Sequence, residues 1–270
     1  MTSLPEMAAV HMKLKILFGL IALAATHCGK SYEELLKDGM ELRRAQKWAD
    51  AKQTLFAAAE KKQTAEVYKE LGNVFLLGEQ NLGEAEGYYK KALGVDPAYI
   101  NAEFNMAVVN LKKYEMTLDD TGKGSDALLD EAQKWFKKVY AQNPNFGVGI
   151  EEMAKYYYYK RDYKNALETA QKAISVDNRN ANAYSVTGQI YYSGIKDYKQ
   201  AFDNFEQARS LNNKDADVVY FLWATSEKLK KVQDATQFKT RYEQMLKQEG
   251  LSADQAKERV KRLENQLKVG

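Results

Sequence analysis

The chain has very few residues that can form covalent or metal-mediated cross-links. Among its 270 residues there is one cysteine, Cys28, and two histidines, His11 and His27. Residues 29–270 therefore contain neither residue type. This absence excludes disulfide bonds, the usual zinc sites, thiol nucleophiles and serine–histidine or cysteine–histidine catalytic pairs from the body of the chain. We expect no catalytic centre of these kinds, no metal and no cofactor.

Residues that interrupt helices are also scarce. The chain has only 3 prolines and 16 glycines, while alanine, leucine, lysine, glutamate, glutamine and tyrosine are common. This composition favours α-helices throughout. It predicts an all-α fold.

No strong charge of one sign is present. Lysine and arginine number 40 and aspartate and glutamate 37, so the net charge is only +3. Proteins that bind nucleic acid usually carry a larger basic excess, because neutralising phosphates drives their affinity. We expect no nucleic-acid partner.

Long hydrophobic runs are missing as well. The longest apolar stretch, residues 16–25, follows the basic start Met12-Lys13-Leu14-Lys15. Ten residues are too few to span a bilayer as a helix, which needs ~20. A basic start, an apolar middle and small residues are typical of a signal peptide, here residues 1–28 with Met12 as an alternative start. A buried first helix is the competing interpretation.

The end of this segment resembles a bacterial lipobox, in which a cysteine is lipidated. Ala25-Thr26-His27-Cys28 carries the resemblance, although Ala25 and His27 depart from the usual residues. It implies a lipid anchor at Cys28 and, with Gly29 rather than aspartate next, sorting to the outer membrane. Ala22-Leu23-Ala24 is a competing site for ordinary signal peptidase, and cleavage there would release a soluble protein.

Alanine residues recur at a nearly constant interval along the chain. Ala51, Ala85, Ala132, Ala166, Ala201 and Ala235 are separated by 34, 47, 34, 35 and 34 residues. Such a period is typical of stacked structural repeats, and the 47-residue interval equals one period plus an insertion of 13 residues.

The residues around these alanines resemble the tetratricopeptide repeat. The second repeat has Tyr68, Gly72, Phe75, Ala85, Tyr89, Ala92 and Pro97, and the fifth has Tyr184, Gly188, Tyr191, Ala201, Phe205 and Ala208. Spacings of three and four place these residues on one helical face, where the small ones let paired helices approach. The resemblance implies a right-handed α-solenoid of helix pairs over residues 32–245, with five clear repeats and a degenerate sixth.

Three features flank or interrupt the array. Ser31-x-x-Glu34 and Ser252-x-x-Gln255 are capping boxes that predict helix starts. Residues 116–128 form the insertion, which we expect to project as a loop that can be removed without loss of stability. Residues 251–268 should form a capping helix over the last hydrophobic surface. The basic excess of residues 228–268 indicates a solvated face rather than a binding patch.

The resemblance also implies a concave groove that holds a peptide or protein segment. Ten residues should line it: Arg43, Arg44, Lys69, Asn73, Lys112, Lys155, Tyr158, Tyr159, Gln189 and Tyr192. Basic and aromatic groups suit an extended polar or acidic segment, or a helix. An ordinary helix surface is the competing interpretation. Tyr157 should instead pack against a neighbouring helix, so its truncation should destabilise the fold.

These features predict a non-enzymatic scaffold or assembly factor. It would be a lipoprotein anchored at Cys28 on the periplasmic face of an outer membrane. Two alternatives remain, a soluble periplasmic partner of a transporter and a carboxylate-based glycan hydrolase. The hydrolase would need two acids that converge in a cleft with shifted pKa values.

Overall fold

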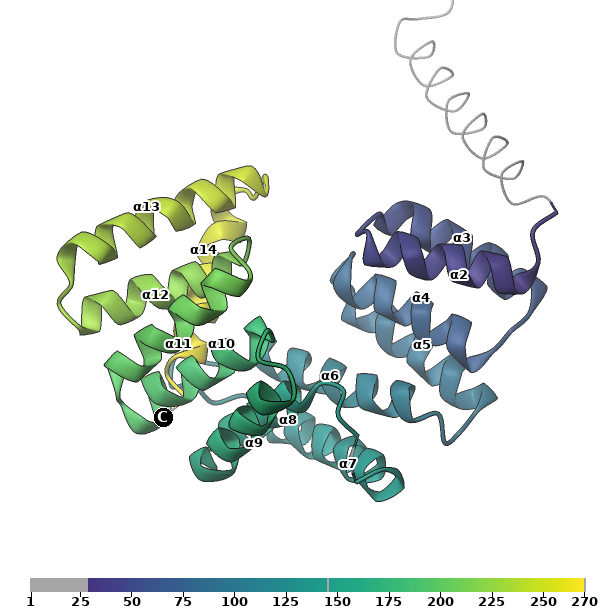
Figure 1. Ribbon diagram of the computed structural model, residues 1–270, viewed down its shortest axis with the longest axis horizontal. Helices are drawn as coiled ribbons and strands as arrows, with labels where there is room; N and C mark the ends of the chain where they lie inside the picture. The colour runs from purple at the N-terminus through teal and green to yellow at the C-terminus, as the bar shows by residue number, and fades with distance from the viewer. Residues whose placement is uncertain (1–28, 145, 270) are drawn as a thin grey trace, which may run out of the picture. The chain divides into compact units, whose positions relative to one another are not determined.

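The computed structural model describes residues 29–144 and 146–269, and within them every regular element is helical. The predicted signal peptide and Cys28 lie outside these residues. The described chain forms two compact units, unit 1 up to Ala102 and unit 2 from Glu103 onward. Figure 1 shows helix pairs stacked within each unit. The all-α solenoid of helix pairs is thus confirmed.

The helices follow one another in pairs along the chain. Unit 1 contains α2 (Tyr32–Arg44), α3 (Trp48–Lys61), α4 (Ala65–Leu77) and α5 (Leu82–Val95), and α6 (Ile100–Met116) crosses the division. Unit 2 continues with α7 (Asp126–Gln142), α8 (Ile150–Tyr159), α9 (Tyr163–Val176), α10 (Ala181–Gln189), the π-helical η1 (Ile190–Ile195), α11 (Tyr198–Leu211), α12 (Ala216–Lys228), α13 (Val232–Gln248) and α14 (Ala253–Gln266).

The helix starts agree with their local sequence signals. Glu34 N donates to Ser31 Oγ at 3.2 Å, and Ser31 N donates to Glu34 Oε2 at 2.7 Å. The reciprocal bonds at Ser252 and Gln255 measure 3.3 and 2.9 Å. Each box satisfies main-chain N–H groups that have no partner within the helix. Both predicted capping boxes are confirmed.

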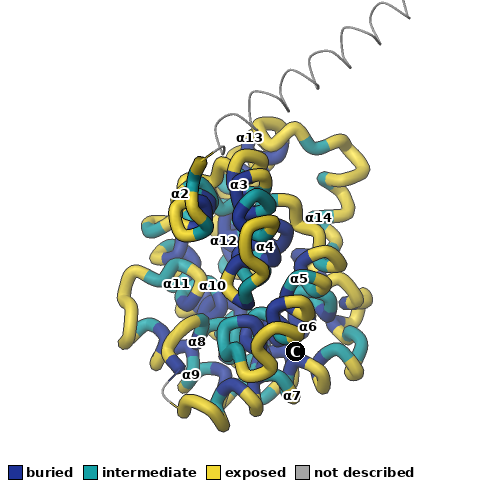
Figure 2. Tube along the Cα trace, turned by 90° about the vertical axis from the view of Figure 1, so that its right-hand side faces the viewer, coloured by how far each residue is buried: buried dark blue, intermediate teal, exposed yellow. Residues whose placement is uncertain are grey.

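Small residues allow the two helices of a pair to approach closely. A Cβ atom on Gly72 would lie 2.4 Å from Cε1 of Tyr89, and one on Gly188 would lie 2.5 Å from Cε1 of Phe205. The tyrosine and phenylalanine rings are fully buried. Figure 2 shows that buried residues follow the helix faces turned toward neighbouring helices. The glycine–aromatic pattern therefore builds the contact within the pairs α4–α5 and α10–α11.

The sixth pair, α12 and α13, is complete although its motif is degenerate. The rings of Tyr220 and Tyr242 lie 5.4 Å apart, and Phe221 lies 5.2 Å from Phe205 of the preceding pair. All four side chains are buried. Aromatic contacts here replace the small-residue contacts of the other pairs.

The last helix, α14, packs on the last helix pair of the array. α14 packs against α12, where Leu263 joins the core that holds Tyr220 and Tyr242, and Figure 1 shows it running behind α12. Its middle is tied to α12 by Arg259, whose Nε donates to Asp217 Oδ1 at 2.7 Å. The helix lies within the predicted bounds 251–268, and its apolar residues pack with those of α12 and α13, the last pair.

The insertion packs against the chain end. The segment between α6 and α7 covers residues 117–125, close to the predicted bounds. Leu118 is buried, and its carbonyl oxygen accepts a 2.9 Å hydrogen bond from Asn265 Nδ2. A Cβ atom on Gly122 would lie 2.4 Å from the carbonyl carbon of Lys268. The prediction of a freely projecting loop is wrong, because the insertion and the chain end bury each other.

Candidate protein-binding site

In unit 1, a buried carboxylate organises the predicted groove residues. Glu70 is only 1% exposed. Arg43 Nε donates to its Oε2 at 2.6 Å, Asn73 Nδ2 does so at 3.4 Å, and Lys69 forms an ion pair with Oε1. Tyr89 OH donates to Asn73 Oδ1 at 2.9 Å and extends the network.

The electrostatics of Glu70 agree with this role. Burial alone would raise the pKa of Glu70, but Lys69 and Arg43 outweigh it and hold the pKa below its ordinary value. Three of the four residues predicted for this part of the groove thus bind an internal acid, and Arg44 is exposed. The prediction missed Glu70, although a carboxylate on a helix face shared with Val67, Leu71 and Val74 is a visible signal.

In unit 2, the tyrosine run has the opposite exposure to the one predicted. Tyr158 and Tyr159 are 0% and 3% exposed, whereas Tyr157 is partly exposed. The ring of Tyr159 lies 5.0 Å from that of Tyr114 in α6. Burial raises the pKa of both Tyr158 and Tyr159 well above the ordinary value. The prediction that these two tyrosines form an open groove is wrong, because the C-terminal segment contacts Tyr158 and α6 packs against Tyr159.

This C-terminal segment, residues 266–269, is held by side-chain hydroxyl groups. Tyr158 OH donates to the carbonyl oxygen of Gln266 at 2.6 Å, and Ser193 Oγ donates to that of Leu267 at 2.9 Å. Tyr163 OH donates to the carbonyl oxygen of Val269 at 2.7 Å. The last carbonyl groups of a helix have no partner within the helix, and these hydroxyl groups supply one. We call the covered surface of α8 and η1 the inner face of unit 2.

Two predicted basic residues are also engaged internally. Lys155 Nζ lies 3.4 Å from Glu115 Oε1 and 3.5 Å from Glu152 Oε2. Burial would lower the pKa of Lys155, but Glu115 and Glu152 raise it well above its ordinary value. Burial would likewise raise the pKa of Glu115, and Lys155 and Lys112 lower it. Lys155 therefore pairs with internal carboxylates rather than facing a partner, and the charge of the half-buried Lys112 also lowers the pKa of Glu115.

The remaining predicted residues, Gln189 and Tyr192, lie at the fifth pair. Gln189 is buried, and Tyr192 is partly exposed with its ring 5.2 Å from that of Tyr198. Tyr192 lines a hollow of about 450 Å³ next to Leu267 and Lys268. Sequence reasoning missed Ser193, because the π-helical turn that carries it has no strong signal in the sequence.

The carboxyl groups with raised pKa values do not form an acid–base pair. Burial, then the neighbouring Glu152, raises the pKa of Glu151, which accepts a 3.1 Å hydrogen bond from Asn180 Nδ2. Burial, then the charge of Asp217, raises the pKa of Asp215, which caps α12 by accepting from the main-chain N–H groups of Asp217 and Val218. The two carboxyl groups lie at the starts of different helices. Each has a structural role that accounts for its environment.

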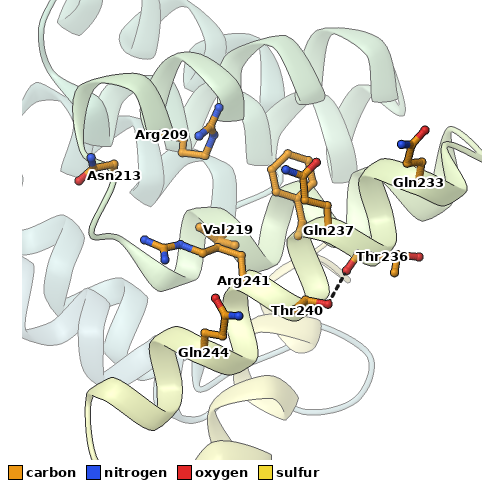
Figure 3. A pocket seen from close by; sticks show the side chains of 10 residues that line it. Arg209, Asn213, Val219, Gln233, Thr236, Gln237, Thr240, Arg241 and Gln244 are labelled. Atoms are coloured by element: carbon orange, nitrogen blue, oxygen red, sulfur yellow. Dashed lines mark hydrogen bonds between the residues drawn. The ribbon is translucent and has the colours of Figure 1, made fainter.

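An open hollow lies between α11 and α13 in unit 2. Its volume is about 1030 Å³, and residues of α11, α12, the loop between them and α13 line it. Figure 3 shows Arg209 and Asn213 on one side, and Gln237, Arg241 and Gln244 of α13 on the other. We call this region the α11–α13 hollow. Unlike the inner face of unit 2, it is not covered by the C-terminal segment.

Two other kinds of site are absent from residues 29–144 and 146–269. No group of three or more histidine, cysteine, aspartate or glutamate residues there could hold a metal ion. Nor does any helix in this part of the chain have the length and hydropathy needed to cross a membrane.

Comparisons with known proteins identify the fold. No family model matches the sequence, and no curated protein matches it either. Among solved structures, a tetratricopeptide-repeat protein of Thermus thermophilus has a TM-score of 0.59 at 15% identity, covering 72% of this chain and 98% of its own. A tetratricopeptide-repeat protein of Parabacteroides merdae has a TM-score of 0.60 at 16% identity, and the match covers 86% of this chain and 84% of that protein.

A third similar structure is that of pilF from Pseudomonas aeruginosa. It has a TM-score of 0.56 at 14% identity and covers 79% of this chain and 91% of its own. These likenesses span most of both chains and confirm the resemblance read from the repeat positions. This chain has the tetratricopeptide-repeat fold.

Proposed function

We propose that this chain is a non-enzymatic scaffold or assembly factor that binds other proteins. Stacked helix pairs expose long surfaces on which side chains from several repeats can contact one partner. The observation that carries the proposal is the α11–α13 hollow, a solvent-open surface built from two successive pairs. A glycan hydrolase would need a pair of acids in a cleft. Among the described residues, the carboxyl groups with shifted pKa values cap a helix or a turn, pair with basic residues, or accept a hydrogen bond from an asparagine.

We further propose that the scaffold is exported and attached to the outer membrane through a lipid on Cys28. The basic start, the apolar residues 16–25 and the lipobox-like end support this location. Only Gly29 and Lys30 precede the first capping box, so the helix array would lie close to the bilayer. Two extended residues reach roughly 7 Å.

Complex formation tests the scaffold function. The purified chain would be mixed with native envelope extract, and complexes would be separated by size-exclusion chromatography with light scattering. We expect a saturable complex of defined stoichiometry and no release of sugars from peptidoglycan by the same preparation. Sugar release that depends on a carboxylate such as Glu151 would contradict the proposal, as would elution of the chain unaltered at every extract concentration.

A further inference from the structure

The α11–α13 hollow has an unusual composition for the surface of a charged helix. On α13, Gln233, Gln237, Thr240 and Gln244 follow one another at spacings of three and four residues, so they lie on one face. Figure 3 shows the side chains of Gln237, Thr240 and Gln244 along the hollow. The acidic residues of α13, Asp234 and Glu243, are absent from its lining. The face of α13 that borders the hollow is therefore polar but carries no negative charge.

Amide side chains suit the recognition of an extended main chain. Each glutamine offers a carbonyl acceptor and an NH₂ donor, which match the N–H and C=O groups of a peptide. The row of polar side chains from Gln233 to Gln244 extends ~16 Å along the helix axis. An extended peptide of about five residues covers the same length. The hollow thus has the dimensions and the hydrogen-bonding groups for a short extended segment.

Two guanidinium groups set the charge of the hollow. Arg209 Nη2 donates to Glu206 Oε2 at 2.6 Å, so its charge is partly compensated. Arg241 is exposed, and no ion pair joins it to an acid among the residues that the structure describes. The lining contains both arginines and no carboxylate. A guanidinium group matches a carboxylate with two parallel hydrogen bonds, so this hollow is complementary to acidic side chains.

We propose that the α11–α13 hollow binds an extended acidic peptide segment of a partner protein, with Arg241 contacting a carboxylate and the glutamines of α13 contacting the main chain. This assignment rests on the proposed scaffold function and names the chemistry of its partner. A nucleic acid is the less suitable anionic ligand, because its binding depends on many basic contacts and this lining supplies two.

Fluorescence anisotropy with synthetic peptides tests the assignment. The probe is a fluorescein-labelled nine-residue peptide of alternating glutamate and serine, compared with peptides in which glutamine or lysine replaces each glutamate. We expect the full chain to bind the glutamate peptide and to bind the other two at least tenfold more weakly. Arg241→Gln should weaken binding roughly threefold to tenfold, the range for a solvent-exposed charge-assisted contact. Arg209→Gln should have a smaller effect because Glu206 shares its charge.

Lys247→Gln is the matched control, since it removes the same charge from an exposed position on the same helix outside the hollow. It should bind like the wild type, and circular dichroism should show equal helix content for all variants. The proposal is overturned if Arg241→Gln and Lys247→Gln have equal effects, if the glutamine peptide binds as tightly as the glutamate peptide, or if a single-stranded oligonucleotide displaces the peptide more effectively than glutamate peptide itself. If the full chain does not bind the glutamate peptide but still forms a complex in envelope extract, this site is refuted while the scaffold function is not.

Discussion

The hydroxyl group of Tyr158 in α8 donates a 2.6 Å hydrogen bond to the main-chain carbonyl oxygen of Gln266, at the end of α14. This contact joins residues 108 positions apart and closes the inner face of unit 2 with the chain's own end. Because this face is covered, a partner must bind to another surface of unit 2. The surface expected to form the groove is internal in unit 2, and the α11–α13 hollow remains open.

The first prediction concerns this hydrogen bond. Tyr158→Phe removes the donor to a buried carbonyl group and should lower the free energy of unfolding by ~1–2 kcal/mol. Tyr157→Phe, one residue away and partly exposed, should change it by less than ~0.5 kcal/mol. Urea denaturation followed by circular dichroism measures both. Equal effects would contradict the placement of the C-terminal segment on the inner face.

The second prediction concerns the contact between the insertion and the chain end. Gly122 and Gly250 have φ angles of +73° and +72°, but only at Gly122 would a Cβ atom meet another part of the chain. Both alanine substitutions should cost ~1 kcal/mol for the left-handed backbone. Gly122→Ala should cost a further ~1–3 kcal/mol, because the added methyl group displaces a packed main chain. Equal melting temperatures for the two variants would mean that the insertion does not pack against Lys268.

The third prediction concerns Glu70 and the pH dependence of stability. Glu70→Gln should destabilise unit 1 by ~1–3 kcal/mol at pH 7, because two basic side chains lose their buried counter-charge. The pKa of Glu70 is lower in the folded chain than its ordinary value of 4.5. Its contribution is therefore present above pH 4.5 and is lost as the pH falls through the folded-state pKa.

The difference between wild type and Glu70→Gln should accordingly shrink in denaturation experiments run at progressively lower pH below 4.5. Glu66→Gln, at an exposed position in the same helix, serves as the control and should change stability by less than ~0.5 kcal/mol at any pH. A difference for Glu70→Gln that stays constant with pH would contradict an ionised, internally paired Glu70.

The fourth prediction concerns the anchor. Cys28→Ala should move the protein from the membrane pellet to the soluble fraction, because a lipid chain can be attached only to the cysteine. Cell fractionation and mass spectrometry of the mature N-terminus measure this. A wild-type protein that is already soluble and begins at Ala25 would show that signal peptidase cleaves after Ala24, as a soluble periplasmic protein requires.

Features encoded by local spacing were predicted well. The 34-residue alanine period and the glycine–aromatic positions identified the helix pairs, and Ser31 and Ser252 marked helix starts. These signals act within one or two helices, so periodicity and capping chemistry are sufficient to read them.

Features that depend on contacts between distant residues were predicted poorly. No local pattern indicates that residue 266 meets residue 158, or that the insertion covers the chain end. The family register placed Tyr158 on the inner face, but its exposure depends on what covers that face. Glu70 could have been found, because a carboxylate on an apolar helix face requires basic partners when buried.

Site-specific photo-crosslinking in intact cells shows whether a partner protein binds in the α11–α13 hollow. A photoreactive amino acid would replace Gln237 in the α11–α13 hollow, Lys247 outside it on the same helix, or Tyr163 beneath the C-terminal segment. We expect a discrete adduct with another protein at position 237 and none at 247 or 163. An adduct at position 163 but not at 237 would contradict this expectation, because the partner would then occupy the inner face of unit 2.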